Sequence, residues 1–554
     1  MADKSYDAVI VGGGHHGLIT GCYLARAGLS VGVFERRYEI GGGAASEDLP
    51  LSGWPRDTHA HFIRFFTAPA YHDFKLYEKG LKLIFPPGAS NSCLWPDGTG
   101  MAMRALYDVK GNTTPDQWPF LPQNMEHNAK QVATFSQKDA DTCYKLAQKY
   151  QDVWKHYVDQ WHYSLPPKAG EKDVDQILID EGLVNPDWAT MDTGAVAYDI
   201  FDSPQLREYY MRLAQGHTGI YPDQPQHLMI TLHTLGSMLG GLPVSISAGG
   251  THNIAHALQR ALMEEGGDFF VLSEVDKIII EGNRAKGIKL VDGTEIEAKK
   301  MVICNTNIHQ TVNQFIGHEN TPAHIVERVK KVHSDMGAWW FWATYYELPK
   351  YIHHEEKYPE ILTQRQYMMP LKPDWFRYEQ YEEFKKGMLP KYIYFHISHP
   401  SHFDPRYAPE GHHSSVVEFY GPPCSYVGGM DWYDKCDPDV WERVVEQWQW
   451  YAPNMKKENF IAWHNTTVRD MAEKLRDMPN GCWTHIDMTN DQMGQRRPIP
   501  EYSRYKTHLD NVYMCGSTMH PGGALHGICG YNAYKRIAED YGLEKPWEKA
   551  GRPF

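Results

Sequence analysis

A glycine-rich turn near the start of the chain constrains the fold more than any other feature of the sequence. Residues Asp7–Gly12 form a short apolar run of the kind found in buried parallel strands, and Gly12, Gly14 and Gly17 follow with G-x-G-x-x-G spacing. A helix-like run comes next, and Leu29–Glu35 reads as a second strand ending on an acid. These residues predict a βαβ unit of about thirty residues.

The spacing of these glycines is that of a dinucleotide-binding turn. Gly12 permits a tight turn, Gly14 lets the backbone approach a pyrophosphate, and Gly17 allows the helix to pack closely on the strand. The helix N-terminus presents free N–H groups to the phosphates. Glu35 stands where a carboxylate accepts hydrogen bonds from the adenosine ribose, which disfavours NADP.

Composition excludes several other classes of protein. Lys+Arg number 55 and Asp+Glu 69, a net charge of −14, so no nucleic-acid partner is expected. The nine cysteines contain no CxxC pair, so neither a disulfide framework nor a metal site is predicted. No stretch approaches the ~20 apolar residues of a membrane-spanning helix, and the chain does not begin with a signal-peptide pattern. A cytoplasmic protein is expected, with peripheral membrane contact left open.

A second glycine cluster distinguishes FAD from NAD. RRYEIGGGAAS (Arg36–Ser46) directly follows Glu35 and resembles the large FAD-dependent group that includes amine oxidases and carotenoid desaturases. The wider pattern is similar to the phytoene desaturase-like flavoproteins. The segments that carry this resemblance are GGGHHGL, PRDTHAHF (Pro55–Phe62), LWPDGTGMAM (Leu94–Met103), SAGGTHNIAHAL, SEVDKIIIEGNRAKGIKL and RRPIPEYSRYKTHLDNVYMCGSTMHPGGALHGICGYNAY.

The resemblance implies a fold and a cofactor site. The expected class is α/β, with a Rossmann-like FAD-binding domain (1–70, 245–308 and 500–554) interleaved with an α+β substrate domain (71–244 and 309–499). The last block would pass the isoalloxazine and present a helix N-terminus to it. The expected FAD-binding residues are Gly12, Gly14, His15, His16, Gly17, Glu35, Arg36, Gly41, Gly42, Gly43, Ala44, Val275, Asn305, Gly516, Gly522, Gly523, Ala524 and Leu525.

Two positions depart from the family pattern. Many relatives have an arginine where this chain has Gly43, so one phosphate contact is missing, and Arg36 or Arg37 is expected to replace it. His59 stands where the family usually has a glycine passing near the flavin. A histidine there is a candidate general base, because imidazole titrates near neutral pH.

His59, His61 and His520 are the candidate catalytic residues. A structural role is the simpler alternative for His61 and His520, and His526 ranks lower as a catalyst. The run Trp339–Trp342 alternates like a strand, so two of its rings are expected to face a substrate cavity and two to pack in the core.

The resemblance implies hydride abstraction from an allylic C–H of a hydrophobic isoprenoid or terpene-like substrate. The product is an alkene, or an allylic alcohol if water activated by His59 captures the resulting cation. A separate electron acceptor is required: oxygen, a quinone or a carrier protein. Two alternatives remain open, a non-catalytic carrier of prenyl or lipid groups and an amine oxidase. The sequence does not indicate the oligomeric state.

Overall fold

A seven-stranded mixed sheet holds the glycine-rich turn. The computed structural model describes residues 4–61, 63–86, 91–359, 361 and 366–552, so Phe62 of the Pro55–Phe62 segment lies outside the described residues. The central strand β1 pairs in parallel with β12 on one side and β2 on the other. The sheet contains β10 (Val275–Glu281), β11 (Arg284–Leu290), β12 (Glu295–Cys304), β1 (Lys4–Val11), β2 (Val31–Phe34), β9 (Asp268–Phe270) and, beside the end of β12, β18 (Val512–Met514).

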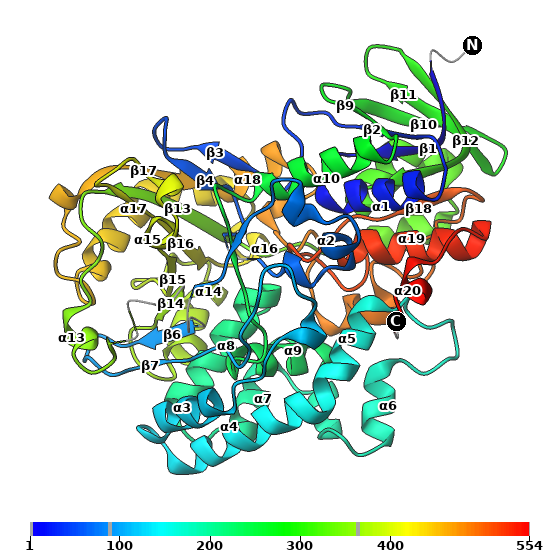
Figure 1. Cartoon of the computed structure of the whole chain (residues 1–554). Helices are drawn as coiled ribbons and strands as arrows, with labels where there is room; N and C mark the ends of the chain where they lie inside the picture. Colours follow the sequence, from blue (N-terminus) through cyan, green and yellow to red (C-terminus); the bar gives the residue numbers. More distant parts are fainter. Residues whose placement is uncertain (1–3, 62, 87–90, 360, 362–365, 553–554) are drawn as a thin grey trace.

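Three helices from distant parts of the chain pack beside one another under this sheet. Figure 1 shows α10 (His252–Glu264), α1 (His15–Arg26) and α19 (Ile528–Tyr541) there, with α1 in contact with both others. The C-terminal ends of β1, β2, β12 and β18 meet at one edge. That edge is where open parallel sheets bind their ligands.

A second seven-stranded sheet forms the other half of the molecule (Figure 1). All of its neighbouring strands pair antiparallel except β14 and β6. In order across the sheet, its strands are β17 (Phe460–Thr466), β13 (Ala338–Tyr345), β16 (His413–Tyr420), β15 (Phe395–Ser398), β14 (Gln366–Met369), β6 (Asn91–Leu94) and β7 (Gly100–Ala102). Side chains of α17 (Asp431–Trp448) pack with Trp339 and Phe341 on one face.

A helical layer lies beyond the second sheet. One continuous helical stretch of this layer consists of α4 (Gln137–Lys149), a π-helical turn and α5 (Lys155–Tyr163). The other helices of this layer include α3 (Pro122–Ala133), α7 (Thr193–Ile200), α8 (Pro204–Thr218) and α9 (Leu228–Met238). Within the described ranges, no helix has both the length and the apolar character needed to cross a bilayer.

The predicted α/β class with a Rossmann-like unit is confirmed. The predicted strands Asp7–Gly12 and Leu29–Glu35 appear as β1 and β2 with ends shifted by one to three residues, and tight turns at Gly282–Asn283 and Asp292–Gly293 join β10, β11 and β12. Strands of the first sheet come from three separated pieces of the chain, and the second sheet is built from residues between those pieces. The domain boundaries given above remain a prediction.

Candidate active site

The turn after β1 is closed around the side chain of Asn305, which follows β12. Asn305 donates a hydrogen bond from Nδ2 to the carbonyl oxygen of Gly12 at 3.2 Å. Gly12 has a φ of 96°, which L side chains rarely adopt. A Cβ on Gly14 would lie 2.8 Å from the Asn305 Nδ2, and one on Gly17 would lie 2.7 Å from the Gly12 oxygen. The first turn of α1 is therefore held against the strands with its backbone open to a phosphate.

A small cavity of about 100 Å³ lies beside this turn. Glu35 and Val275 line it, as do Arg36 and Arg37. The Glu35 carboxylate accepts hydrogen bonds of 2.8 Å from the backbone N–H groups of Gly13 and Arg37. Burial raises the pKa of Glu35, and these two hydrogen bonds oppose the shift. The carboxylate is thus fixed in orientation before any ribose arrives.

The second glycine cluster lies against the first. The N–H of Gly41 donates to the carbonyl of Gly13 at 3.0 Å, and a Cβ on Gly43 would lie 2.9 Å from the methyl group of Met478. Ala44 is buried beside this cluster. The position that carries arginine in many relatives is therefore filled by close packing here, while Arg36 and Arg37 lie in the small cavity.

The C-terminal block closes the same site from the other side. Gly516 follows β18, and a Cβ there would lie 3.2 Å from the backbone of Thr306. Gly523 packs on the backbone of Thr484, and Gly522 has a φ of 126°. Ala524 and Leu525 line the main cavity, next to His15 and His16.

That main cavity has a volume of about 560 Å³ and joins the glycine turns to the second sheet. Its lining includes Gly14, Gly41–Gly43 and Asn305 at one part, and Trp340, His396 and Glu418 of the second sheet at another. Exposed Asp116 and Ala550 are also among the lining residues, so they mark where it approaches the surface. One continuous space thus connects the glycine turns with these three side chains of the second sheet. We call Trp340, His396 and Glu418 the substrate wall.

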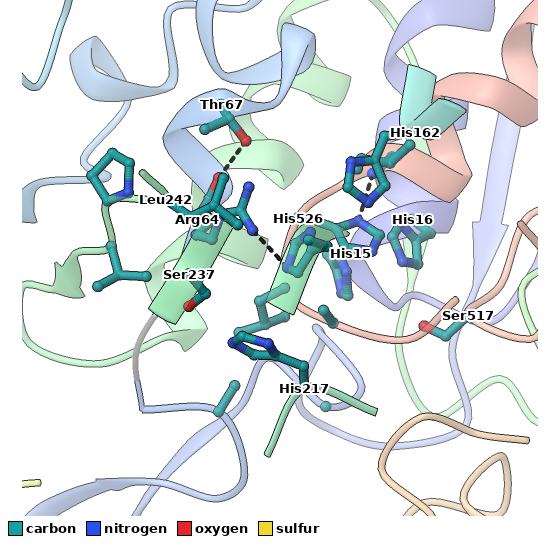
Figure 2. A pocket seen from close by; sticks show the side chains of 18 of the residues that line it. His15, His16, Arg64, Thr67, His162, His217, Ser237, Leu242, Ser517 and His526 are labelled. Carbon is teal, nitrogen blue, oxygen red and sulfur yellow. Dashed lines mark hydrogen bonds between the residues drawn. The ribbon is translucent and has the colours of Figure 1, made fainter. Parts of the chain in front are cut away.

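Imidazoles dominate the part of the cavity between these regions. Figure 2 shows His15, His16, His162 and His526 gathered near Arg64. The Arg64 Nη1 and the His233 Nε2 are 3.0 Å apart, and the ring of His233 lies edge-on to those of His162 and His217. We call this set the histidine wall: His15, His16, His162, His217, His233 and His526.

Burial disfavours the charged form of five of these six histidines, His15, His16, His162, His233 and His526. It lowers the pKa of His15 to about 4 and that of His526 to about 3, and neighbouring imidazoles contribute to both shifts. The pKa values of His16, His162 and His233 also fall well below the ordinary value, mainly through burial. At neutral pH these five rings therefore form a polarisable surface without positive charge.

The second sheet contributes one row of side chains to the cavity. Trp340 of β13, Glu418 of β16 and His396 of β15 are direct cross-strand partners. Trp340 lines the cavity, whereas Trp342 packs in a buried cluster with Val416. The expectation that two rings of the Trp339–Trp342 run face the cavity therefore holds for Trp340 and is wrong for Trp342.

Of the three candidate catalytic histidines, two line the cavity. The ring of His59 lies 5.8 Å from that of Trp340, and the ring of His61 lies 6.3 Å from that of His396. The His59 Nδ1 is 2.9 Å from the Thr58 hydroxyl, and its Nε2 is buried without a hydrogen bond from the described residues. Burial lowers the pKa of His59 to about 3.

His520 is placed differently. It does not line the cavity, and its Nε2 lies 2.6 Å from the backbone oxygen of Trp161, whose ring it meets edge-on. That contact joins the loop before α19 to α5. The geometry favours the structural role for His520 over the catalytic one.

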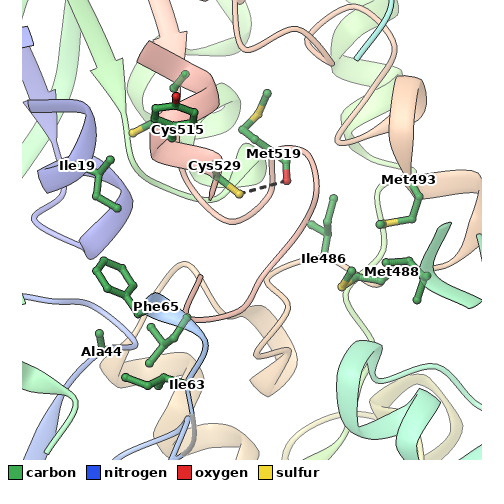
Figure 3. Close-up of a cluster of buried hydrophobic side chains, with 14 of the residues drawn as sticks. Ile19, Ala44, Ile63, Phe65, Ile486, Met488, Met493, Cys515, Met519 and Cys529 are labelled. Atoms are coloured by element: carbon green, nitrogen blue, oxygen red, sulfur yellow. Dashed lines mark hydrogen bonds between the residues drawn. The ribbon is translucent and has the colours of Figure 1, made fainter. Parts of the chain in front are cut away.

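Arg497 and an apolar cluster support the loop after β18. Buried Arg497 donates hydrogen bonds to the backbone oxygens of Ser517 and Met519. It also donates to four others, those of Thr484, Ile486, Asp487 and Gln492. Figure 3 shows Met519 and Cys529 in a cluster of buried side chains, with the Cys529 thiol 3.7 Å from the Met519 oxygen. Arg497 and the buried cluster thus fix the backbone of the loop Ser517–His526 on the side away from the cavity.

Sequence reasoning missed the two polar residues of the substrate wall and the arginine beside the histidine wall. Glu418, His396 and Arg64 belong to no recognised motif. One signal was available: Glu418 interrupts the apolar run of β16, whose residues Ser414–Tyr420 are all buried. A carboxylate in such a strand is costly unless it is paired or functional.

The fold defines a class of protein, one in which a Rossmann-like domain and a second sheet share one cavity. Residues 10–78 match the family described as NAD(P)-binding Rossmann-like domain. Among solved structures, an oxidoreductase from Methanosarcina mazei aligns with a TM-score of 0.60 at 15% identity, covering 96% of this chain and 99% of its own. Cyclohexylamine oxidase from Brevibacterium oxydans gives 0.58 at 15%, covering 97% and 99%. These likenesses establish the fold.

Sequence relatives narrow the class. One of the subunits of limonene dehydrogenase from Castellaniella defragrans is 25% identical over 98% of this chain and 96% of its own length. The neurosporene-forming phytoene desaturase of Cereibacter sphaeroides is 22% identical over 94% and 92%. Pyridine nucleotide-disulfide oxidoreductase domain-containing protein 2 of Rattus norvegicus is 24% identical over 97% and 94%. The resemblance to the phytoene desaturase-like flavoproteins that the motifs indicate is confirmed by these relatives, and the chain is an oxidoreductase.

Proposed function

We propose that the protein is an FAD-dependent oxidoreductase that removes a hydride from an allylic C–H of a hydrophobic isoprenoid. The observation that carries this proposal is the single cavity that runs from the glycine turns to Trp340 and the histidine wall. The relative from limonene dehydrogenase, which matches nearly the whole chain, supports a terpene-like substrate.

The chain's residues fit FAD in two places. Glu35 and Val275 in the small cavity suit the adenosine, and the paired glycine clusters leave no room for side chains where a pyrophosphate would pass. When bound, FAD would supply the two-electron acceptor for the hydride. The protein's part is to orient the allylic carbon and to exclude water from it.

Different residues of the main cavity would position the hydrocarbon and set the local charge. Trp340 and the neutral imidazoles offer ring surfaces that position a hydrocarbon without binding it through hydrogen bonds. Arg64 adds one positive charge, held beside His233. A cationic substrate carbon is disfavoured near that guanidinium, so the reacting carbon is expected away from Arg64.

His59 bears on the choice between alkene and alcohol. Its buried Nε2 could take the proton of a water that captures the allylic cation, giving an alcohol. His59→Gly restores the residue usual in relatives and should lower the fraction of alcohol relative to alkene. An unchanged alcohol rate in this variant would remove His59 from the mechanism.

The experiment that tests the proposed function is anaerobic titration of the purified, FAD-loaded protein with a panel of terpenes, carotenoids and amines. Bleaching of the flavin absorbance by an isoprenoid hydrocarbon supports the proposal. Bleaching by amines alone would make the protein an amine oxidase, and a colourless protein that takes up no FAD would make it a carrier. The electron acceptor is then identified by adding oxygen, a quinone or a carrier protein to the reduced enzyme.

A further inference from the structure

Glu418 of β16 is a buried carboxylate on the part of the main cavity that the second sheet lines. Its side chain is 8% exposed, it lines the cavity, and its strand neighbours Trp340 and His396 line the cavity as well. The other acidic lining residues are exposed Asp116, Asp159 paired with Lys155 at 2.9 Å, and Asp477 beside the glycine clusters. Among the described lining residues, Glu418 is the carboxylate that belongs to the second sheet.

The two carboxylate oxygens of Glu418 are placed differently. Oε1 accepts a hydrogen bond from the hydroxyl of Tyr420, two residues along the same face of β16. Oε2 lies 4.0 Å from the Nδ1 of His396, beyond hydrogen-bond length, and accepts no hydrogen bond from the described residues. One oxygen is thus fixed while the other remains able to accept a proton.

Two opposing effects act on the pKa of Glu418. The guanidinium of buried Arg212 stacks 4.5 Å from the centre of the Tyr420 ring and favours the ionised form of Glu418. Burial acts more strongly and raises the pKa of Glu418 above its usual value. A carboxylate with a raised pKa is a better proton acceptor near neutral pH than an exposed one.

We infer that Glu418 is the proton acceptor of the reaction and that its carboxylate stabilises the cationic allylic carbon. This inference rests on the proposed function. The substrate loses a hydride, with both electrons of one C–H bond, to the oxidised flavin. A neighbouring C–H then loses its proton to the Glu418 Oε2, and the electron pair of that bond becomes the new C=C π bond. When bound, FAD would be the two-electron acceptor for this hydride, and an external acceptor (oxygen, a quinone or a carrier protein) would take the electrons onward.

The first test compares the wild-type holoenzyme with Glu418→Gln, which keeps the shape and an acceptor for Tyr420. Equal FAD content and substrate affinity are expected, with alkene formation in a single turnover slowed about 10²-fold or more. Glu208→Gln is the matched control, because Glu208 is also a buried carboxylate but accepts a hydrogen bond from the backbone N–H of Phe376 outside the cavity lining. Its turnover should stay at the wild-type level.

The second test measures binding without turnover. A C10 allylic ammonium mimics the cation, and the C10 allylic alcohol of the same skeleton is its neutral counterpart. Calorimetry should show the ammonium bound more tightly than the alcohol by the wild type, and Glu418→Gln should lose about tenfold or more of that preference. If Glu418→Gln does not fold, Glu418→Asp, which withdraws the carboxylate by one methylene, should show the same losses.

The outcomes separate the two proposals. Wild-type turnover and ammonium preference that persist in Glu418→Gln would overturn the role of Glu418 and leave the proposed function standing. If no isoprenoid reduces the wild-type flavin, the proposed function fails. The ammonium preference then still decides whether Glu418 forms a cation site.

Discussion

The backbone N–H of Gly13 donates a 2.8 Å hydrogen bond to the carboxylate of Glu35, which joins the turn after β1 to the end of β2. The second carboxylate oxygen is held by the N–H of Arg37. Both contacts come from backbone groups, so the orientation of Glu35 depends on the fold and not on a flexible partner. A ribose then meets an acceptor that needs no rearrangement to bind it.

We therefore expect Glu35→Gln to weaken FAD binding. A hydrogen bond to a charged group contributes about 1.5–3 kcal/mol, which corresponds to roughly 10–100-fold in the dissociation constant. Titration of the apoprotein with FAD, followed by flavin fluorescence, measures the change. Glu39→Gln is the control, because Glu39 pairs with His256 at 3.0 Å outside both cavities. Equal affinities in the two variants would contradict a ribose contact at Glu35.

Gly17→Ala tests the closeness of α1 to the turn. The new Cβ would lie 2.7 Å from the backbone oxygen of Gly12, so the helix must move. We expect a loss of about 1–3 kcal/mol in the free energy of unfolding and weaker FAD binding. Gly21→Ala on the same helix is the control, since its nearest neighbour is the end of the Ile10 side chain at 3.2 Å. Chemical denaturation that ranks Gly21→Ala as the more damaging change would refute this geometry.

The sequence predicts those parts of the site whose residues lie close together in the chain, and it does not predict those formed by contacts between distant segments. The turn at Gly12–Gly17 and the acid at Glu35 are close in sequence, so local spacing was enough to place them. Glu418 lies beside Trp340 because β13 and β16 pair in one register, and these residues are far apart in the chain. No local pattern contains that register, so the polar part of the substrate wall had to come from the structure.

The same reason explains His520. The sequence placed it in the block that closes over the flavin, where a catalytic role was plausible. Its position is decided instead by contact with Trp161, more than three hundred residues earlier. Contact with α5 thus holds His520 away from the cavity lining, although the neighbouring His526 reaches it.

Arg497→Met should loosen the loop after β18. Arg497 is buried, and its loss would leave the backbone oxygen of Ser517 without its donor and that of Met519 with only the weak Cys529 thiol donor. An unsatisfied buried acceptor costs about 1–3 kcal/mol, so we expect a lower melting temperature and faster loss of FAD on dilution. Arg496→Met is the control, because Arg496 is exposed and bonds to the oxygen of Asn490. Similar melting temperatures for the two variants would count against the anchoring role.

The histidine wall should make the protein sensitive to acid. Burial lowers the pKa of His526 to about 3 in the folded state, while the unfolded chain has the ordinary value of about 6.5. Below pH 6.5 the unfolded state therefore binds more protons, and the stability contribution present above that pH is lost as the pH falls toward 3. The loss is about 1.4 kcal/mol per pH unit for each such histidine.

His526→Asn isolates one histidine of this set. Its unfolding free energy should fall less steeply between pH 6.5 and 5 than that of the wild type, by about 1–2 kcal/mol over the interval. Removal of the exposed His318 controls for the loss of an imidazole as such. Denaturation curves at several pH values measure both slopes. If His526→Asn and the wild type lose stability in parallel, the buried imidazole is not the source of the acid sensitivity, and the wall would have to be charged in the folded protein.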